Sequence, residues 1–196
     1  VNQLAIAITT VVFNRSALLF AGEDGVAAVS IIMYLQFLCI GIYFGFSMGL
    51  STPLGYAYGD RNFSVCRVLE KYAYRFFAIA PIILYGCTYL LAPIGVYFFA
   101  SPGSTVFDMA VSGLRLYGLG FLFSGINIFA AIRMMTYGKG YISGMITFLR
   151  SFALLLLFLT VLPRFLELNG IWLAVPAAEI LTLIVALWTL RKKTVA

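Results

Sequence analysis

The chain has 196 residues, of which 63% are hydrophobic and only 10% are charged, and its formal net charge is +6. A soluble domain carries about a quarter charged residues, so this composition indicates a protein that lies in a membrane. The basic residues are scattered at the ends of apolar runs, which argues against nucleic-acid binding.

Catalytic and metal-binding side chains are sparse. Histidine, the commonest general base and metal ligand, is absent, and the three cysteines form no C-x-x-C pair. Only one carboxylate, that of Glu179, lies deep in an apolar run. No catalytic residue, metal site, cofactor or enzymatic activity is therefore expected.

Six apolar runs follow one another, each close to the roughly 20 residues that a helix needs to cross a bilayer. They predict an all-α polytopic membrane protein with a single six-helix domain over residues 1–196. The expected transmembrane helices cover residues 4–20, 27–51, 73–99, 110–135, 142–162 and 170–190.

The second run has two distinct faces. Gly41, Gly45 and Gly49 fall four residues apart and form a small face against which another helix can pack closely. Polar side chains follow helical spacing on the other side, and polar groups at this depth need protein or a watery cavity beside them. Together with polar residues of the first and fourth runs, they are expected to line a substrate cavity: Asn14, Gln36, Tyr43, Ser47 and Asn127. The alternative is that they bond neighbouring helices.

The second run is expected to end at Pro53 and to leave the membrane. After it, residues 61–72 have the pattern of a short amphipathic helix at the membrane surface. Val65, Val68, Leu69 and Tyr72 recur at helical spacing, and the charged side chains lie away from them.

Two arginines mark the ends of the fourth run. Arg115 and Arg133 are 18 residues apart, about 27 Å of helix, which is close to the hydrocarbon thickness of a bilayer. Each is therefore expected to extend its charged group to one membrane surface.

Basic residues alternate between loops. One set of loops holds Arg61, Arg67, Lys71, Arg75, Arg133, Lys139, Arg191, Lys192 and Lys193, whereas the other set holds only Arg164 and Arg115. By the positive-inside rule, the 60–72 loop, the 136–141 turn and the C-terminus are cytoplasmic. The sequence thus predicts a multi-pass protein of the cell (inner) membrane.

Arg150 and Glu179 are oppositely charged residues deep in the last two runs. Both lie about 16–18 Å from the cytoplasmic ends of their helices. Because an isolated charge at that depth is costly, and consecutive helices are usually neighbours, we expect the two to form an ion pair. The pair is either structural or, alternatively, a proton-coupling element in which Glu179 takes up a proton and releases Arg150.

Several segments resemble, in order, the multidrug and toxic compound extrusion (MATE) transporters. They are residues 45–59 (GFSMGLSTPLGYAYG), 125–127 (GIN), 137–140 (YGKG), 149–151 (LRS) and 169–179 (NGIWLAVPAAE). The resemblance covers nearly the whole chain, and the order of the segments is similar to that in the second six-helix lobe of a twelve-helix protein. Because the chain opens with Val1 directly in an apolar run, the first lobe is expected to be missing upstream.

The resemblance implies a cation-coupled antiporter. Such proteins use an Na⁺ or H⁺ gradient to export organic cations and other amphipathic compounds by alternating access of a central site. The partners it implies are small amphipathic or cationic substrates, the lipid bilayer and the first lobe, in the same chain or in a second subunit.

The sequence departs from the family in one respect. Some branches place carboxylates within the first and fourth helices of this lobe, where they bind the coupling cation. Here the first run offers only Thr9, Thr10 and Asn14, and the only acid near the fourth is Asp108 at its outer end. The coupling-ion site is therefore expected in the missing first lobe. A lipid-linked flippase of related fold and a structural membrane assembly protein remain as alternatives.

Overall fold

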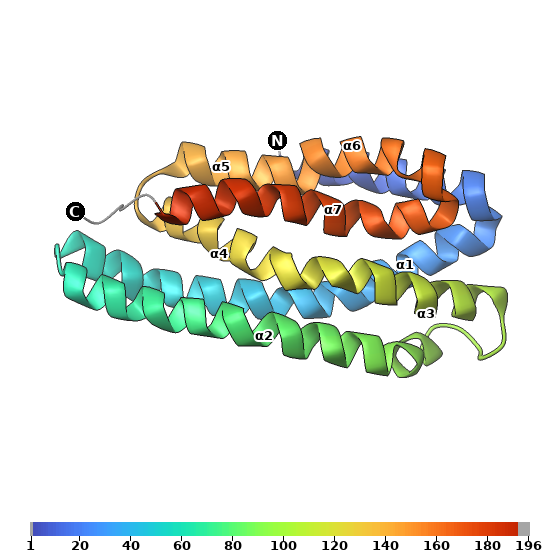
Figure 1. The fold of residues 1–196 in the computed structure, drawn as a ribbon, viewed down its shortest axis with the longest axis horizontal. Helices are drawn as coiled ribbons and strands as arrows, with labels where there is room; N and C mark the ends of the chain where they lie inside the picture. The colour runs from blue at the N-terminus through green and yellow to red at the C-terminus, as the bar shows by residue number, and fades with distance from the viewer. Residues whose placement is uncertain (1, 192–196) are drawn as a thin grey trace.

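The computed structural model describes residues 2–191, with side chains from residue 7 to residue 190, and this part of the chain forms a bundle of long helices without strands (Figure 1). The all-α fold class is confirmed. Five helices are long and apolar enough to cross a membrane, and the first contains two limbs, so the bundle has six helical limbs. The side chains of Arg191, Lys192 and Lys193, on which the predicted orientation partly rests, lie outside the described residues.

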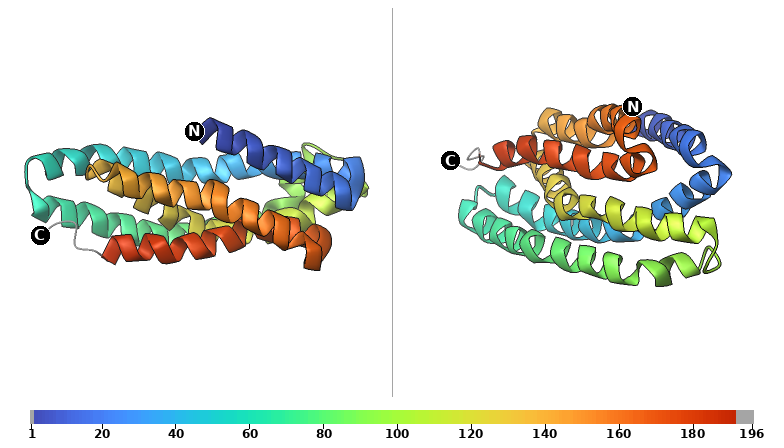
Figure 2. Two further views of the ribbon diagram at one scale, coloured as in Figure 1. Left: turned by 90° about the horizontal axis from the view of Figure 1, so that it is seen from above. Right: turned by 45° about the vertical axis from the view of Figure 1, so that its right-hand side comes forward.

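Helix α1 (Asn2–Gly59) turns back on itself at Gly22, where φ is 63° and ψ is −154° (Figures 1 and 2). Backbone in this region is open almost only to glycine. The turn separates a first limb, residues 2–21, from a second limb, residues 23–59.

The second limb of α1 does not end at Pro53, as the sequence had suggested, but continues to Gly59. Leu54 and Ala57, beyond the proline, are buried against Cys66 and Tyr137. Proline removes only one hydrogen-bond donor from the helix, and this packing offsets the loss.

Helix α2 (Phe63–Tyr97) begins at Asn62, whose side chain accepts a hydrogen bond from the backbone nitrogen of Val65 at 3.3 Å. Residues 61–72 therefore do not form a separate amphipathic helix, because residues 63–72 are the first turns of α2. In these turns Cys66 and Ala73 are buried inside the bundle, whereas Val65, Val68 and Tyr72 are exposed.

The centre of the bundle is formed by α4 (Phe121–Thr136), which follows α3 (Thr105–Tyr117) and a 3₁₀ turn, η1 (Gly118–Gly120). Helix α4 contacts α1 and α2 on one side and the last helices on the other (Figure 2). Gly125 permits a close approach to α2, since a Cβ atom there would lie 2.8 Å from the Phe77 ring.

The fifth limb consists of α5 (Gly140–Phe148), a π turn, η2 (Leu149–Ala153), and α6 (Leu154–Val161). The sixth limb is α7 (Pro163–Arg191). Helix α7 bends at Glu167, a non-glycine residue with φ 50°. In Figure 1 the α1–α2 and α4–α5 turns share one end of the bundle, and the Gly22 and α6–α7 turns share the other.

Candidate functional site

A buried polar centre joins the last helices to α4. The Arg150 guanidinium donates to Glu179 Oε1 through Nη2 at 2.6 Å and through Nε at 3.1 Å. Asn127 Nδ2 donates to Glu179 Oε2 at 2.7 Å and to the Glu179 backbone oxygen at 2.9 Å. The structure thus brings together three of the residues singled out from the sequence, which we call the polar centre: Asn127, Arg150 and Glu179.

The polar centre lies inside the lobe. Asn127 is fully buried, and the side chains of Arg150 and Glu179 are 14% and 5% exposed. Both oxygens of the Glu179 carboxylate accept hydrogen bonds, so its charge is compensated. Asn127 Oδ1 is buried without a partner, which leaves one open acceptor in the centre.

Arg150 reaches Glu179 from an irregular part of its helix. The π turn η2 contains one residue more per turn than an α-helix, which rotates the faces of α5 and α6 relative to each other by about 100°. Such turns are frequent at functional sites. The hydropathy pattern, which is continuous through residues 142–162, gives no sign of this insertion.

The two faces of the second α1 limb are reversed with respect to the sequence prediction. Tyr43 is fully buried and donates through its hydroxyl to the Phe121 carbonyl at 3.0 Å, and Ser47 is 1% exposed. These side chains pack inside the lobe and do not line a cavity in it. The glycine face instead points outward, because a Cβ atom built on Gly41, Gly45 or Gly49 meets nothing within 4 Å. The interior of the lobe supplies an acceptor for the Tyr43 hydroxyl, whereas Ser47 Oγ is buried without a hydrogen-bond partner among the described residues.

The two remaining cavity candidates keep some exposure. Gln36 is half-buried and accepts a hydrogen bond from the Tyr117 hydroxyl, which ties α1 to α3. Asn14 is half-buried in a groove of about 580 Å³ between the two limbs of α1, with Arg15 and Glu23 as its charged lining residues. The groove lies close to the Gly22 turn and apart from the polar centre.

A second buried charge cluster, which the sequence did not suggest, lies at the end of the bundle with the α1–α2 turn. Arg133 Nε bonds to Glu70 Oε1 at 2.5 Å, and the Tyr137 hydroxyl donates to the same oxygen at 2.6 Å. The Arg133 guanidinium also lies 5.1 Å from the centre of the Tyr137 ring. We call Glu70, Arg133 and Tyr137 the end cluster.

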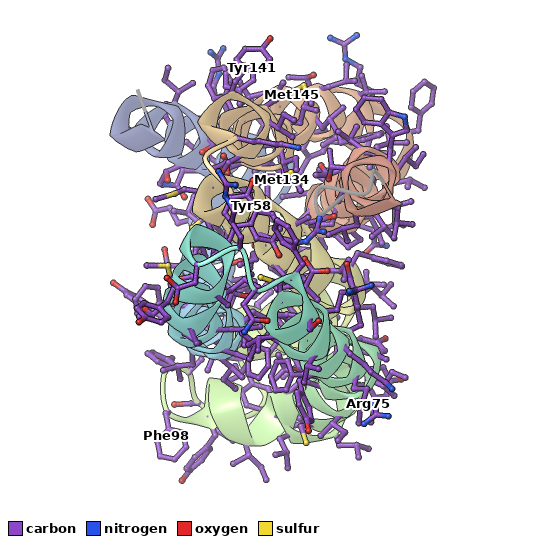
Figure 3. The ribbon with its side chains drawn as sticks, turned by 90° about the vertical axis from the view of Figure 1, so that its left-hand side faces the viewer. Tyr58, Arg75, Phe98, Met134, Tyr141 and Met145 are labelled. Atoms are coloured by element: carbon purple, nitrogen blue, oxygen red, sulfur yellow. The ribbon has the colours of Figure 1, made fainter. Side chains whose placement is uncertain are left out.

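The end cluster corrects the expected role of Arg133. Its side chain is only 3% exposed and pairs with Glu70 between the helices, so it is not an exposed surface arginine. Burial, followed by the hydrogen bond to Glu70, raises the pKa of Tyr137, so this phenol stays a donor. Figure 3 looks onto this end and shows Tyr58, whose ring is 4.5 Å from that of Tyr137, between the helices. The one feature of the sequence that indicates this cluster is Glu70, because it is the only acid in α2 and needs a basic partner.

No group of three or more His, Cys, Asp or Glu side chains that could hold a metal ion occurs within residues 7–190. The polar centre can hold two helices together by charge, exchange a proton at the Glu179 carboxylate or accept a hydrogen bond at Asn127 Oδ1. It contains no nucleophile and base pair.

Comparison with known proteins gives a family and a fold. The MatE family model matches residues 1–162. Comparison with curated proteins gave no significant match. Among solved structures, the chain is similar to an outward-facing conformation of a multidrug resistance MATE family transporter of the MOP superfamily, with 23% identity and a TM-score of 0.86; the match covers 96% of this chain and 43% of that one.

Two further structures give similar values. A MOP superfamily transporter from Pyrococcus furiosus Vc1, described as having a binding pocket of reverse polarity that suggests a different function, matches at 23% identity and TM-score 0.86, with 96% and 43% coverage. An inward-facing conformation of a multidrug resistance MATE family transporter matches at 22% identity and TM-score 0.87, covering 96% of this chain and 44% of that one.

The chain therefore spans less than half the length of the structures it resembles. MATE family members are transporters, which agrees with the expectation of no enzymatic activity. The apolar helices and the family match together indicate a multi-pass membrane protein. From the match over residues 1–162, we conclude that the chain belongs to the MatE family.

Proposed function

We propose that the chain is one six-helix lobe of an antiporter that exports organic cations in exchange for Na⁺ or H⁺. The observation that carries this proposal is that the same lobe fits an outward-facing and an inward-facing MATE structure equally well, with TM-scores of 0.86 and 0.87. A lobe whose internal fold is the same in both states supports a mechanism in which two lobes rock about a central site.

The exposed glycine face of α1 supports a partner lobe. Among the described residues, no other part of the lobe covers the backbone at Gly41, Gly45 and Gly49. Exposed aromatic side chains such as Phe37 and Phe44 flank this face. A small-residue face allows another helix to approach closely in a membrane. The partner is the first lobe of the transporter, in the same chain or in a second subunit.

The first limb of α1 supports a water-filled cavity. Arg15 is exposed and lies seven residues from Gly22, about 10 Å along the helix. A charged side chain at that depth is costly in lipid unless it reaches the membrane surface, and we place it against water in the cavity. We therefore keep Asn14 and Gln36 as cavity residues and assign Tyr43, Ser47 and Asn127 to contacts inside the lobe.

The coupling ion is proposed to bind in the first lobe. In this lobe the carboxylate of the polar centre is held by Arg150 and Asn127, and Asp108 is exposed at the start of α3. We favour a structural role for the Arg150–Glu179 pair, with proton coupling as the alternative.

The charge distribution supports an inner-membrane protein with its C-terminus in the cytoplasm. Exposed basic residues gather at the end of the bundle with the α1–α2 and α4–α5 turns: Arg61, Arg67, Lys71, Arg75 and Lys139. Most exposed acids lie at the other end, namely Glu23, Asp24, Asp108 and Glu167; the exceptions are Asp60 in the α1–α2 turn and the basic Arg164 at the start of α7. This asymmetry follows the positive-inside rule.

One observation favours a second candidate, a flippase for lipid-linked substrates. Arg15 is exposed on the first α1 limb, and an arginine that faces a cavity suits an anionic headgroup. A purely structural assembly protein is no longer favoured, because the family consists of transporters.

Transport by reconstituted protein tests the proposal. In liposomes with an inward Na⁺ or H⁺ gradient, the two-lobed protein should expel a fluorescent organic cation, and residues 1–196 alone should not, because a single lobe leaves its cavity face open. Cation efflux by residues 1–196 alone would refute the two-lobe account. Movement of a fluorescent anionic lipid between leaflets, without cation efflux, would favour the flippase.

A further inference from the structure

Three basic side chains form a stripe along the first turns of α2. Arg67, Lys71 and Arg75 are spaced by four residues, and all three are exposed. Four residues advance a helix by about 6 Å and turn it by about 40°, so the three side chains share one face over about 12 Å. Figure 3 shows Arg75 at the outer edge of α2, pointing away from the bundle. We call these residues the basic stripe.

No acid of α2 neutralises the basic stripe. Glu70 is the only acid in this helix, and at three residues from Arg67 it would be the natural surface partner. The structure turns Glu70 inward, where its carboxylate is taken up by Arg133 and Tyr137. Among the described residues, no ion pair involves any member of the stripe.

The basic stripe leads directly into exposed apolar surface on the same helix. One turn beyond Arg75, Ile79 is 60% exposed, and Ile82 and Ile83 follow with 65% and 60%. Tyr72 and Tyr74 flank the stripe and are exposed, as is typical of side chains at the border of a membrane. Positive charge above exposed apolar side chains matches a phospholipid, whose phosphate would meet the stripe and whose acyl chains would lie on the isoleucines.

We propose that the basic stripe is a binding site for the headgroups of anionic phospholipids in the leaflet that faces the α1–α2 turn. A soluble phosphate would use the charges but not the apolar surface below them. Each basic residue near an anionic membrane surface contributes about a fivefold increase in lipid binding, so three together contribute about a hundredfold. The site is independent of what the transporter carries.

Lipid binding to the purified protein tests the site. The delipidated protein is titrated with phosphatidylglycerol, phosphatidylcholine or inorganic phosphate, and bound lipid is counted by native mass spectrometry. We expect Arg67→Gln/Lys71→Gln/Arg75→Gln to weaken phosphatidylglycerol binding by about a hundredfold and to leave phosphatidylcholine binding unchanged. The charge-preserving variant Arg67→Lys/Arg75→Lys should retain binding, which separates loss of charge from loss of fold.

A matched control separates the stripe from the general positive charge of this end. Arg61→Gln/Lys139→Gln removes two exposed basic residues at the same end but outside the stripe, and it should change binding much less than Lys71→Gln/Arg75→Gln. Equal losses in the two double variants would overturn the proposal. So would displacement of phosphatidylglycerol by inorganic phosphate, which would point to a free anion site, or an unchanged affinity in the triple variant.

Discussion

Replacing Glu70 with glutamine should destabilise the lobe by about 3–5 kcal/mol, because it leaves the buried Arg133 guanidinium without its counter-charge. Arg133 is 3% exposed, and its Nη1 atom already lacks a hydrogen-bond partner. The free energy of unfolding in detergent, from denaturant titration followed by circular dichroism, measures the effect.

Two control variants identify the cause. Tyr137→Phe removes only one hydrogen bond to the same carboxylate and should cost about 1 kcal/mol. Glu70→Gln/Arg133→Met removes both charges and should be less unstable than Glu70→Gln. If Glu70→Gln unfolds at the same denaturant concentration as the unmodified protein, the end cluster does not stabilise this end of the bundle.

Removing one partner of the Arg150–Glu179 pair should destabilise the lobe more than removing both. Glu179→Gln leaves the guanidinium, and Arg150→Met leaves the carboxylate, uncompensated within the membrane, and either should cost about 3–5 kcal/mol. The double variant should lose clearly less than the sum of the single variants. The measurement is the yield of folded protein in detergent, checked by thermal unfolding. Additive losses would show that the pair does not hold α7 to η2.

The same variants separate the structural role from proton coupling. If Glu179 carries the coupling proton, Glu179→Gln should fold normally but transport without dependence on the pH gradient. If the pair is structural, the variants that fold should keep the gradient dependence of the unmodified protein. Asn127→Leu serves as a control, since it removes two hydrogen bonds of the polar centre without changing its charge.

The positions of the helices follow from hydropathy, because a membrane requires every backbone group to be bonded within a helix. The pairing of Arg150 with Glu179 follows from the cost of a charge at the same depth in two adjacent helices. Sequence periodicity does not indicate which face of a helix packs against the rest of the lobe. In the second α1 limb, either the glycine face or the polar face could pack inside the lobe. The structure buries Tyr43 of the polar face and exposes Gly45 of the glycine face.

The missed end cluster has a similar origin. The separation of Arg115 and Arg133 matches the thickness of a bilayer, which favoured two surface arginines, and only the fold shows that Glu70 comes within 2.5 Å of Arg133. The π turn at Arg150 leaves no compositional trace.

The reaction of single cysteines with a water-soluble maleimide in the intact membrane tests the account most directly. In a background that lacks Cys39, Cys66 and Cys87, Asn14→Cys should react, because the first α1 limb faces the proposed cavity, and its reactivity from each side should change when substrate is added. Ser47→Cys, inside the lobe, and Ile82→Cys, on the exposed apolar surface of α2, should not react. If Ser47→Cys reacts as fast as Asn14→Cys, or if Asn14→Cys does not react from either side, the proposed cavity face is wrong.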